Sequence, residues 1–161
     1  MRKFEKISFE QFKKDIQDDK KLCEEYNLPS RSTKSSAGYD FESLIDFVLK
    51  PNEVKMIPTG IKASMNEEEV LLLIVRSSQG FKYNVRMCNQ VGVIDKDYYN
   101  SKENEGHIWI KLINEGDKDY VVKKKDKIVQ GIFMNFLLVD DEKEIEKERT
   151  GWTVLEKKRG K

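Results

Sequence analysis

HIWIKLI, which runs from His107 to Ile113, alternates two sets of side chains at every second position. One set is Ile108, Ile110 and Leu112, and the other is Trp109, Lys111 and Ile113. Successive side chains of a β-strand point to opposite faces, so a period of two is typical of a strand. This stretch therefore predicts a strand with two different faces.

Seven further short runs on both sides of this stretch are apolar or alternating, and turn residues such as KPNE and NEGDKD separate them. They are LIDFVL (44–49), EVKMIP (53–58), GIKASM (60–65), VLLLIV (70–75), VGVI (91–94), YVV (120–122) and KIVQGIFMNFLLV (127–139). No amphipathic segment of helix length interrupts them before about Asp141, which argues against a parallel βαβ sheet. We predict a mainly β domain, built as an antiparallel sandwich or barrel.

Residues 1–27 have a different pattern and are predicted to form a helical extension. Ser8 can cap a helix, Gln11 occupies the capping-box position, and an apolar stripe follows at helical spacing. The stripe consists of Phe9, Phe12 and Ile16. The next stretch, QDDKKLCEEY, either continues this helix or forms a second short one.

The β domain is assigned to residues 28–140. It starts in a loop, because NLPSRSTKSSAG breaks all periodicity with proline, glycine and five Ser/Thr residues. Residues 141–161 are highly charged and poor in apolar side chains, so they cannot form a core by themselves. We expect this segment to be an extended C-terminal arm.

The composition excludes several classes of function. The chain has 161 residues, enough for one domain, and its 30 Lys+Arg nearly balance its 29 Asp+Glu. Such a surface has no overall attraction for nucleic acid or membrane. The two cysteines are too few for a disulfide framework, and the first residues lack the apolar core of a signal peptide. We expect a cytoplasmic protein that binds neither nucleic acid nor membrane.

Common catalytic and phosphate-binding motifs are absent from the sequence. His107 is the single histidine, so a catalytic triad would depend on it; we expect instead an exposed residue at the start of a strand. The phosphate-binding loop GxxxxGK[ST], GxGxxG and HExxH are also missing. Any phosphate site must therefore use carboxylates, Arg, Ser, Gln and backbone amides.

Four stretches concentrate polar residues where a β domain would have turns. They are SAGYDF (36–41), RSSQGFKYN (76–84), NQVGVIDKDYYN (89–100) and KKDKIVQ (124–130). In the second, Gly80 would allow a tight turn, and its arginine, hydroxyls and free amides could hold an anion. An ordinary turn with Arg76 paired to a carboxylate is the alternative.

The other polar residues each have two interpretations. Asp95 ends an apolar strand, where it could activate a water as general base or simply stabilise a turn. Tyr98 could stack on a ligand ring or pack in the core. Gln130 lies within an apolar strand, so its amide needs a partner, which could be structural or a ligand.

Together these pieces resemble the trimeric dUTPase family over about residues 28–130. LPSRSTKSSAGYDF looks like the first family motif, RSSQGFKYNV like the second, NQVGVIDKDY like the third (N-x-x-G-V-I-D-x-D-Y) and KKDKIVQ like the fourth. Asn89 follows Arg76 by 13 positions and Asp95 follows it by 19, the spacing expected in the family. Four motifs in order at this spacing make the resemblance specific.

The resemblance implies a distorted jelly-roll-type β-barrel that assembles as a homotrimer with active sites between subunits. It also implies Mg²⁺-assisted hydrolysis of dUTP to dUMP and pyrophosphate. In that reaction Asp95 would activate the water that attacks the α-phosphorus, and Tyr98 would stack under the deoxyribose. Asn89 and the hairpin backbone at Gly92 and Val93 would contact uracil.

The remaining roles implied by the resemblance concern the phosphates and the metal. Residues that would hold the phosphates, or the carboxylate that organises them, are Arg76, Ser77, Ser78 and Gln130. Asp40 would support Mg²⁺ through a water molecule. In the arm, Arg149 would bind the γ-phosphate and Trp152 could replace the aromatic residue that stacks on uracil.

The sequence departs from the family pattern at several places. Ser78 stands where the family usually has glycine, Lys125 replaces a glycine of the fourth motif, and YNSKENEGH is an apparent insertion after Tyr98. The arm reads ERTGWTVLEKKRG and lacks the family's G-S-T-G. This arm favours one alternative, a nucleotide-binding module that contacts a protein partner with weakened catalysis. A dCTP deaminase shares the fold, but it needs a glutamate near Lys111.

Overall fold

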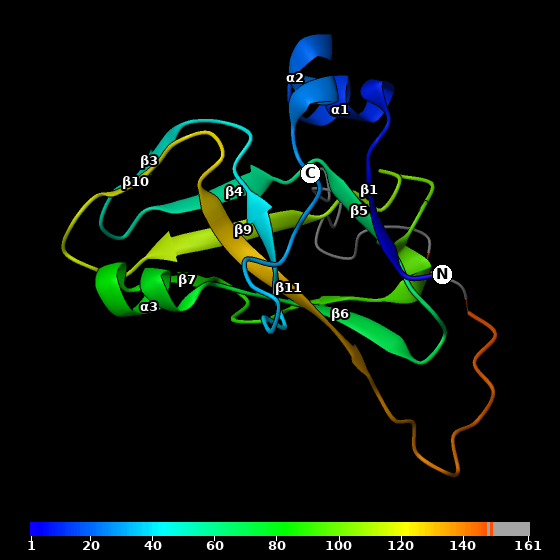
Figure 1. Ribbon diagram of the computed structural model, residues 1–161. Coiled ribbons are helices and arrows are strands. Elements are labelled where there is room, and N and C mark those ends of the chain that lie inside the picture. Colours follow the sequence, from blue (N-terminus) through cyan, green and yellow to red (C-terminus); the bar gives the residue numbers. More distant parts are fainter. Residues whose placement is uncertain (148, 150–161) are drawn as a thin grey trace, which may run out of the picture.

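The computed structural model describes residues 1–147 and 149, and most of its elements are short strands (Figure 1). The strands are β1 (Lys3–Lys6), β2 (Tyr39–Glu42), β3 (Phe47–Leu49), β4 (Val54–Pro58), β5 (Ile61–Ser64), β6 (Glu69–Ile74), β7 (Val85–Met87), β8 (Gly92–Ile94), β9 (Trp109–Asn114), β10 (Tyr120–Val122) and β11 (Lys127–Asn135). The helices are α1 (Phe9–Asp15), α2 (Lys20–Glu25), α3 (Ser77–Tyr83) and a single 3₁₀ turn, η1 (Lys96–Tyr98).

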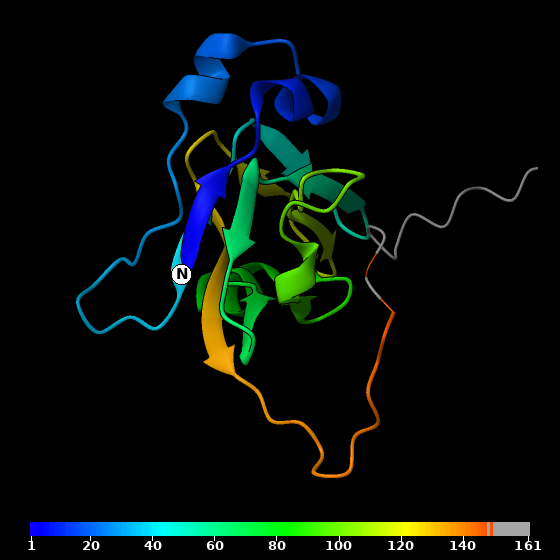
Figure 2. The same cartoon turned by 90° about the vertical axis from the view of Figure 1, so that its right-hand side faces the viewer.

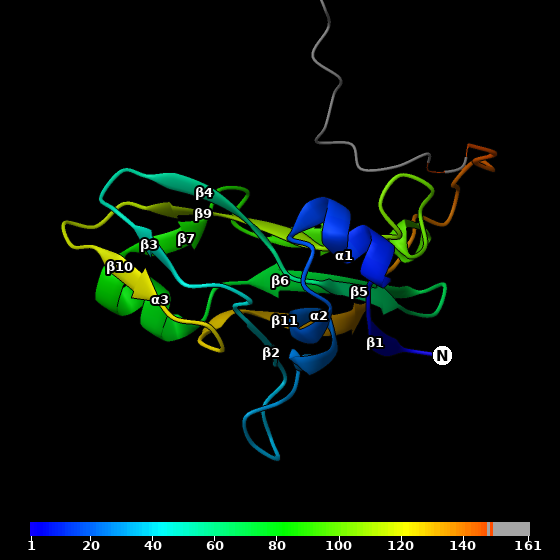
Figure 3. The same ribbon diagram turned by 90° about the horizontal axis from the view of Figure 1, so that it is seen from above.

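Two sheets lie one above the other and enclose the core (Figure 3). One has the order β2-β11-β6-β8 and the other β4-β9-β7, while β1-β5 and β3-β10 form separate pairs. All strand pairs are antiparallel. The mainly β prediction is therefore confirmed. Within the described residues the strands form four separate sheets, whose arrangement is jelly-roll-like, rather than one closed barrel.

The predicted strands are found, with shifted ends. Each of the eight runs contains an observed strand, and Ile108, Ile110 and Leu112 are buried as one face of their run. The last run ends at Asn135 rather than at Val139. Asn135 pairs with Glu69, the first residue of β6, so the chain beyond it has no strand partner there.

The register of β11 brings polar residues of distant motifs together. Gln130 lies opposite Asp40 of β2 on one side and opposite Ile74 of β6 on the other. Arg76 follows β6 by two positions. Strand β8 pairs with the opposite edge of β6, where Gly92 faces Leu73. The central strands β6 and β11 thus fix the positions of both groups of candidate site residues.

The N-terminal segment is helical in two places and extended in a third. Ser8 caps α1 by accepting a hydrogen bond from the backbone N–H of Gln11, as predicted, and α2 is the second short helix. Phe12 is fully buried. Residues 3–6, however, form β1, which pairs with β5 beside the two helices (Figure 2). The helical prediction was wrong there, because backbone pairing with β5 outweighs the helical pattern.

The stretch RSSQGFKYN was predicted as a turn, but it forms helix α3. Gln79 stabilises the start of α3, because its side-chain oxygen accepts the backbone N–H of Arg76 at 2.7 Å. Asn84 ends the helix in the left-handed conformation, at φ 52°. Gly80 lies inside α3, and a Cβ there would meet nothing within 4 Å, so this glycine does not make a tight turn.

Among the described residues, no helix has the length and apolar character needed to cross a membrane.

Candidate active site

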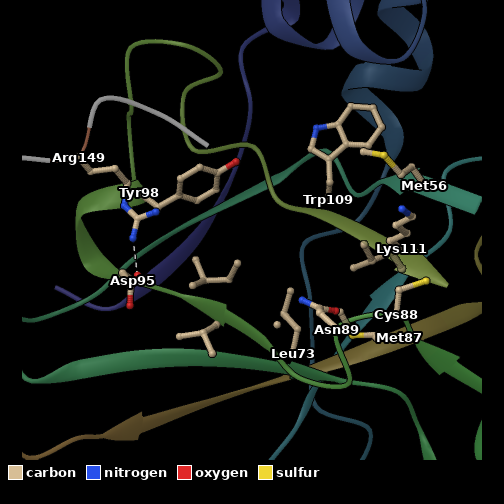
Figure 4. A pocket seen from close by; sticks show the side chains of 14 residues that line it. Met56, Leu73, Met87, Cys88, Asn89, Asp95, Tyr98, Trp109, Lys111 and Arg149 are labelled. Carbon is tan, nitrogen blue, oxygen red and sulfur yellow. Dashed lines mark hydrogen bonds and ion pairs between the residues drawn. The ribbon is translucent and has the colours of Figure 1, made fainter. Parts of the chain in front are cut away.

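The predicted site residues fall into two groups on one chain. Six of them line a single pocket of about 240 Å³: Asn89, Gly92, Val93, Asp95, Tyr98 and Arg149 (Figure 4). The second group gathers around Asp40 at the junction of β2, β11 and α3 and does not line that pocket. Trp152 lies outside the described residues.

The pocket begins at the tight turn between β7 and β8. The hairpin expected here is not formed, because β7 pairs with β9 and β8 pairs with β6 in the other sheet. The turn is closed by hydrogen bonds from the Gln90 N–H to the Met87 carbonyl (2.9 Å) and from the Val91 N–H to the Asn89 carbonyl (2.6 Å). Gln90 has a φ of 62°, which reverses the chain within four residues. Asn89 and Val93 are exposed in this segment, whereas Gly92 is buried. A Cβ on Gly92 would lie 3.1 Å from Leu73, so β8 packs closely on β6.

Asp95 follows β8 directly and is the N-cap residue of η1. Its side chain is 49% exposed, so its carboxylate is open to solvent at the rim of the pocket. The Arg149 guanidinium donates to Asp95 and, at 2.7 Å, to Asp97. One guanidinium of the arm thus bridges two carboxylates, those of Asp95 and Asp97.

Tyr98 is buried, and its hydroxyl is fixed by two hydrogen bonds. It donates to the carbonyl oxygen of His107 at 2.7 Å and accepts from the Asn104 side chain at 2.7 Å. Burial raises the pKa of Tyr98, so the phenol stays protonated. Gly106 has a φ of 77°, and a Cβ there would lie 2.3 Å from the Tyr98 carbonyl, so the insertion packs directly against the pocket wall.

The second group is a network of charges around the Asp40 carboxylate. Arg76 Nε lies 3.0 Å from one oxygen, Lys127 Nζ lies 3.0 Å from the other, and Ser32 also donates to it. Burial opposes ionisation of Asp40. The hydrogen bonds from Ser32 and Lys127 and the charge of Arg76 outweigh it and hold the pKa of Asp40 below its usual range.

The other predicted members of this group lie next to the network. Ser77 and Ser78 are exposed on the first turn of α3, directly after Arg76. Gln130 donates to the Val75 carbonyl at 3.4 Å, and its side-chain oxygen fills the space that a Cβ on Gly38 would occupy. Gln130 therefore has structural contacts in this chain, while the serine hydroxyls face solvent.

Several residues of the site were not predicted. Trp109, Lys111 and Met56 line the side of the pocket opposite Asp95 (Figure 4). Trp109 and Lys111 share the outward face of HIWIKLI, so the alternation placed them away from the core without indicating a pocket. Lys127 belongs to the polar stretch KKDKIVQ and Ser32 to the loop before SAGYDF, but only the fold shows that both meet Asp40.

His107 was predicted to be exposed, and this was wrong. It is fully buried, with Nδ1 at 2.6 Å from Asp15 and Nε2 accepting the Gly60 N–H at 2.9 Å. The sequence pattern could not reveal this, because Asp15 and Gly60 come from distant segments.

Comparison with known proteins agrees with this geometry. Residues 24–154 match the dUTPase family. The deoxyuridine 5'-triphosphate nucleotidohydrolase of Lactococcus lactis subsp. lactis is 48% identical over 126 residues, which cover 78% of this chain and 84% of that protein. The Haemophilus influenzae protein of the same name is 31% identical over 142 residues, 83% of this chain and 90% of its own.

Two solved structures are similar in fold. The dUTPase from Streptococcus mutans has a TM-score of 0.68 and 38% identity, covering 85% of this chain and 98% of its own. A mutant dUTPase from phage phi11 of S. aureus, which coordinates a structural Mg(II) ion, has a TM-score of 0.65 over 91% and 97% of the two chains and 21% identity. With most of its length matched by the family and by close relatives, the chain belongs to the dUTPase family.

Proposed function

We propose that this protein hydrolyses dUTP to dUMP and pyrophosphate, which limits uracil incorporation into DNA and supplies dUMP. The observation that carries the proposal is the pocket. One cavity is lined by the turn residue Asn89, the aromatic ring of Tyr98, the solvent-open carboxylate of Asp95 and the arm residue Arg149. The 48% identical relative named for this activity supports the same conclusion.

Asp95 is proposed to orient and activate the attacking water. A general base must reach a water molecule, and a half-exposed carboxylate at the pocket rim meets this need. The water attacks the α-phosphorus in line with the leaving pyrophosphate. Arg149 donates a hydrogen bond to Asp95, and a γ-phosphate would offer its guanidinium a more highly charged partner and release Asp95 for this role.

The β7–β8 turn with β8, together with Tyr98, is proposed to select the nucleoside. Asn89 and the backbone at Gly92 and Val93 would hydrogen-bond the uracil edge, and cytosine would present a donor where an acceptor is required. Tyr98 would pack under the deoxyribose and leave no space for a 2′-hydroxyl. The tight turn and close β8 packing support a fixed geometry for this part of the site.

The second group is proposed to hold the phosphates. Ser77, Ser78 and Gln130 would contact phosphate oxygens with Arg76, while the Asp40 carboxylate orients Arg76 through their ion pair. From the arm, Arg149 would grip the γ-phosphate and Trp152 would cover the uracil. Cleavage of a triphosphate depends mainly on such positioning and charge neutralisation.

Mg²⁺ is the proposed cofactor, with Asp40 as its support through a water molecule. The described residues contain no group of three or more His, Cys, Asp or Glu side chains that could hold a metal. This fits Mg²⁺, which keeps several waters and takes other ligands from substrate phosphates rather than from a protein cage. When bound, the ion would neutralise negative charge on the phosphates.

We further propose a cytoplasmic homotrimer with its sites between subunits. Both cysteines are free thiols, as expected in a reducing compartment. The separation of the two residue groups on one chain supports an intersubunit site, in which a neighbouring chain brings the second group to the pocket.

The test is pyrophosphate release from dUTP, dCTP and UTP with Mg²⁺. We expect rapid release from dUTP, much less from UTP and none from dCTP. Binding of dUTP without cleavage would instead support the nucleotide-binding module. Ammonia release from dCTP would support the deaminase, which the exposed Lys111 at the pocket disfavours.

A further inference from the structure

Helix α1 contacts the buried wall behind the pocket through Asp15 and His107. Asp15, the last residue of α1, lies 2.6 Å from His107 Nδ1, while the Gly60 N–H donates to Nε2. Because Nε2 accepts a hydrogen bond, the ring proton lies on Nδ1 and points to the Asp15 carboxylate. The imidazole is fully buried and is held at both nitrogens.

His107 in turn contacts both aromatic residues that line the pocket. Its carbonyl oxygen accepts the hydrogen bond of the Tyr98 hydroxyl at 2.7 Å. Its ring lies 5.2 Å from that of Trp109, at an angle of 50° between the planes. A shift of His107 would therefore change the positions of two pocket residues at once.

A second set of contacts joins α1 to the insertion after Tyr98. The Ser8 N–H, at the start of α1, donates to Glu105 at 3.0 Å, and Lys14 donates to the Glu103 carbonyl at 3.3 Å. Asn104, between these two acidic residues, donates to the Tyr98 hydroxyl. Both partners of the Tyr98 hydroxyl are thus connected to α1. His107 is connected through Asp15, and Asn104 is connected through its neighbours Glu103 and Glu105.

We propose that α1 is a positioning element for the sugar-facing side of the pocket, and that Asp15 and His107 are positioning residues that set the preference for deoxyuridine over uridine nucleotides. The inference rests on the proposed function, in which Tyr98 packs under the deoxyribose. A wall of this kind rejects an added hydroxyl only while its ring cannot move, and the α1 contacts restrict that movement.

The experiment measures binding, which needs no turnover. The ligands are the α,β-imido analogues of dUTP and UTP, which resist cleavage, and calorimetry gives their dissociation constants for wild type and variants with Mg²⁺. The ratio of the two constants is the readout, because a general loss of stability affects both ligands alike. We expect wild type to favour the deoxy analogue by about 100-fold, the scale on which a close-packed pocket rejects one hydroxyl.

Asp15→Ala removes the acceptor for His107 and should lower this ratio about tenfold, whereas Asp15→Asn keeps an acceptor oxygen and should stay within about twofold. Asp18→Ala is the matched control. It removes an exposed carboxylate three positions after Asp15. That carboxylate forms an ion pair with Lys13, so its loss should leave the ratio unchanged. A folded Asp15→Ala protein with the wild-type ratio overturns the proposal.

If Asp15→Ala does not fold, Gln11→Ala tests the same positioning role. The Gln11 side chain donates to Asp15 at 2.6 Å, so its removal loosens Asp15 and should lower the ratio about two- to threefold. An unchanged ratio in this variant overturns the proposal. Wild type that binds both analogues equally also overturns it. Wild type that fails to cleave dUTP but keeps the binding preference refutes the proposed hydrolysis and leaves the positioning role supported.

Discussion

Asp95 and Asp97 are two exposed carboxylates that share Arg149 but have different proposed roles. Replacing Asp95 by Asn removes the general base with little change in shape. We expect Asp95→Asn to lower kcat for dUTP by at least about 100-fold, the usual contribution of a general base, while nucleotide binding survives. Pyrophosphate release and calorimetric titration with the imido analogue measure the two effects.

Asp97→Asn is the matched control for this variant. It removes the neighbouring partner of Arg149 and should keep kcat within about threefold, since exposed ion pairs contribute little. Equal loss of activity in the two variants would show that the Arg149 contact matters, and not a base at Asp95. Residual activity of Asp95→Asn near the wild-type level would refute the assignment directly.

The Asp40 network predicts a specific dependence of stability on pH. The folded pKa of Asp40 lies below its unfolded value of about 3.9, so its stabilising effect is complete above that pH and is lost as pH falls through the folded pKa. Wild type should exceed Asp40→Asn in free energy of unfolding at pH 7. The difference should begin to shrink as pH falls below about 3.9 and should vanish only below the lowered folded pKa, where Asp40 is neutral in both states.

Urea unfolding of both proteins between pH 2.5 and 7 measures this difference. The cations that face Asp40 are Arg76 and Lys127, and both are present in wild type and in the variant. A difference that is constant over the whole range would contradict a stabilising ionised Asp40.

At the scale of elements, α3 depends on one buried glutamine. The Gln79 side chain accepts the Arg76 N–H and donates to the Tyr120 hydroxyl (3.0 Å) and the Ile128 carbonyl (2.6 Å). It therefore ties α3 to β10 and β11. Gln79→Ala leaves these buried groups without partners and should lower the free energy of unfolding by about 2–3 kcal/mol.

Urea unfolding again gives the measurement, and Gln17→Ala serves as the control. Gln17 is exposed, and its side chain donates a hydrogen bond to Asp19 at 3.2 Å on the surface, so its loss should change stability by less than about 0.5 kcal/mol. If Gln79→Ala is equally harmless, the contacts of Gln79 do not hold α3 in place.

The same helix shows why some elements could not be predicted from sequence. The serines and the glycine of RSSQGFKYN are typical of turns, whereas the helix is stabilised by Gln79 contacts with residues more than forty positions away. Strand β1 has a similar explanation, since its partner β5 is distant in sequence. By contrast, local sequence predicts β9 through its alternation and β6 through its apolar run, and every second residue of each strand is buried.

At the scale of the whole molecule, the motifs predicted the candidate site residues. They did not predict that one chain holds these residues in two separate groups. Asn89, Asp95 and Tyr98 are close in sequence and meet at one pocket. Asp40 and Arg76 come from different motifs and meet through the β2-β11-β6 register. Neither Lys127 nor His107 could be assigned a contact from sequence, because each bonds across segments that only the fold brings together.

This division predicts complementation between inactive variants. If a trimer joins the pocket of one subunit to the Asp40–Arg76 group of another, Asp95→Asn and Arg76→Gln damage different halves of each site. Unfolding and refolding an equal mixture should then give mixed trimers in which about one site in four is intact. A site is intact only when its pocket comes from an Arg76→Gln chain and its Asp40–Arg76 group from an Asp95→Asn chain, and each condition is met with a probability of about 0.5. Dynamic and static light scattering should report a trimer for each variant alone.

The expected activity is about a quarter of the wild-type value, from two variants that are each inactive. Asp95→Asn refolded alone, at the same total protein concentration, is the control for activity gained by refolding itself. It should stay inactive. Arg76→Gln keeps the length of the side chain while removing its charge, so the Asp40 network loses one cation but retains Lys127 and Ser32. Absence of recovery from correctly sized mixed trimers would mean that each chain builds its own site, and the two residue groups would then have to approach each other within one subunit.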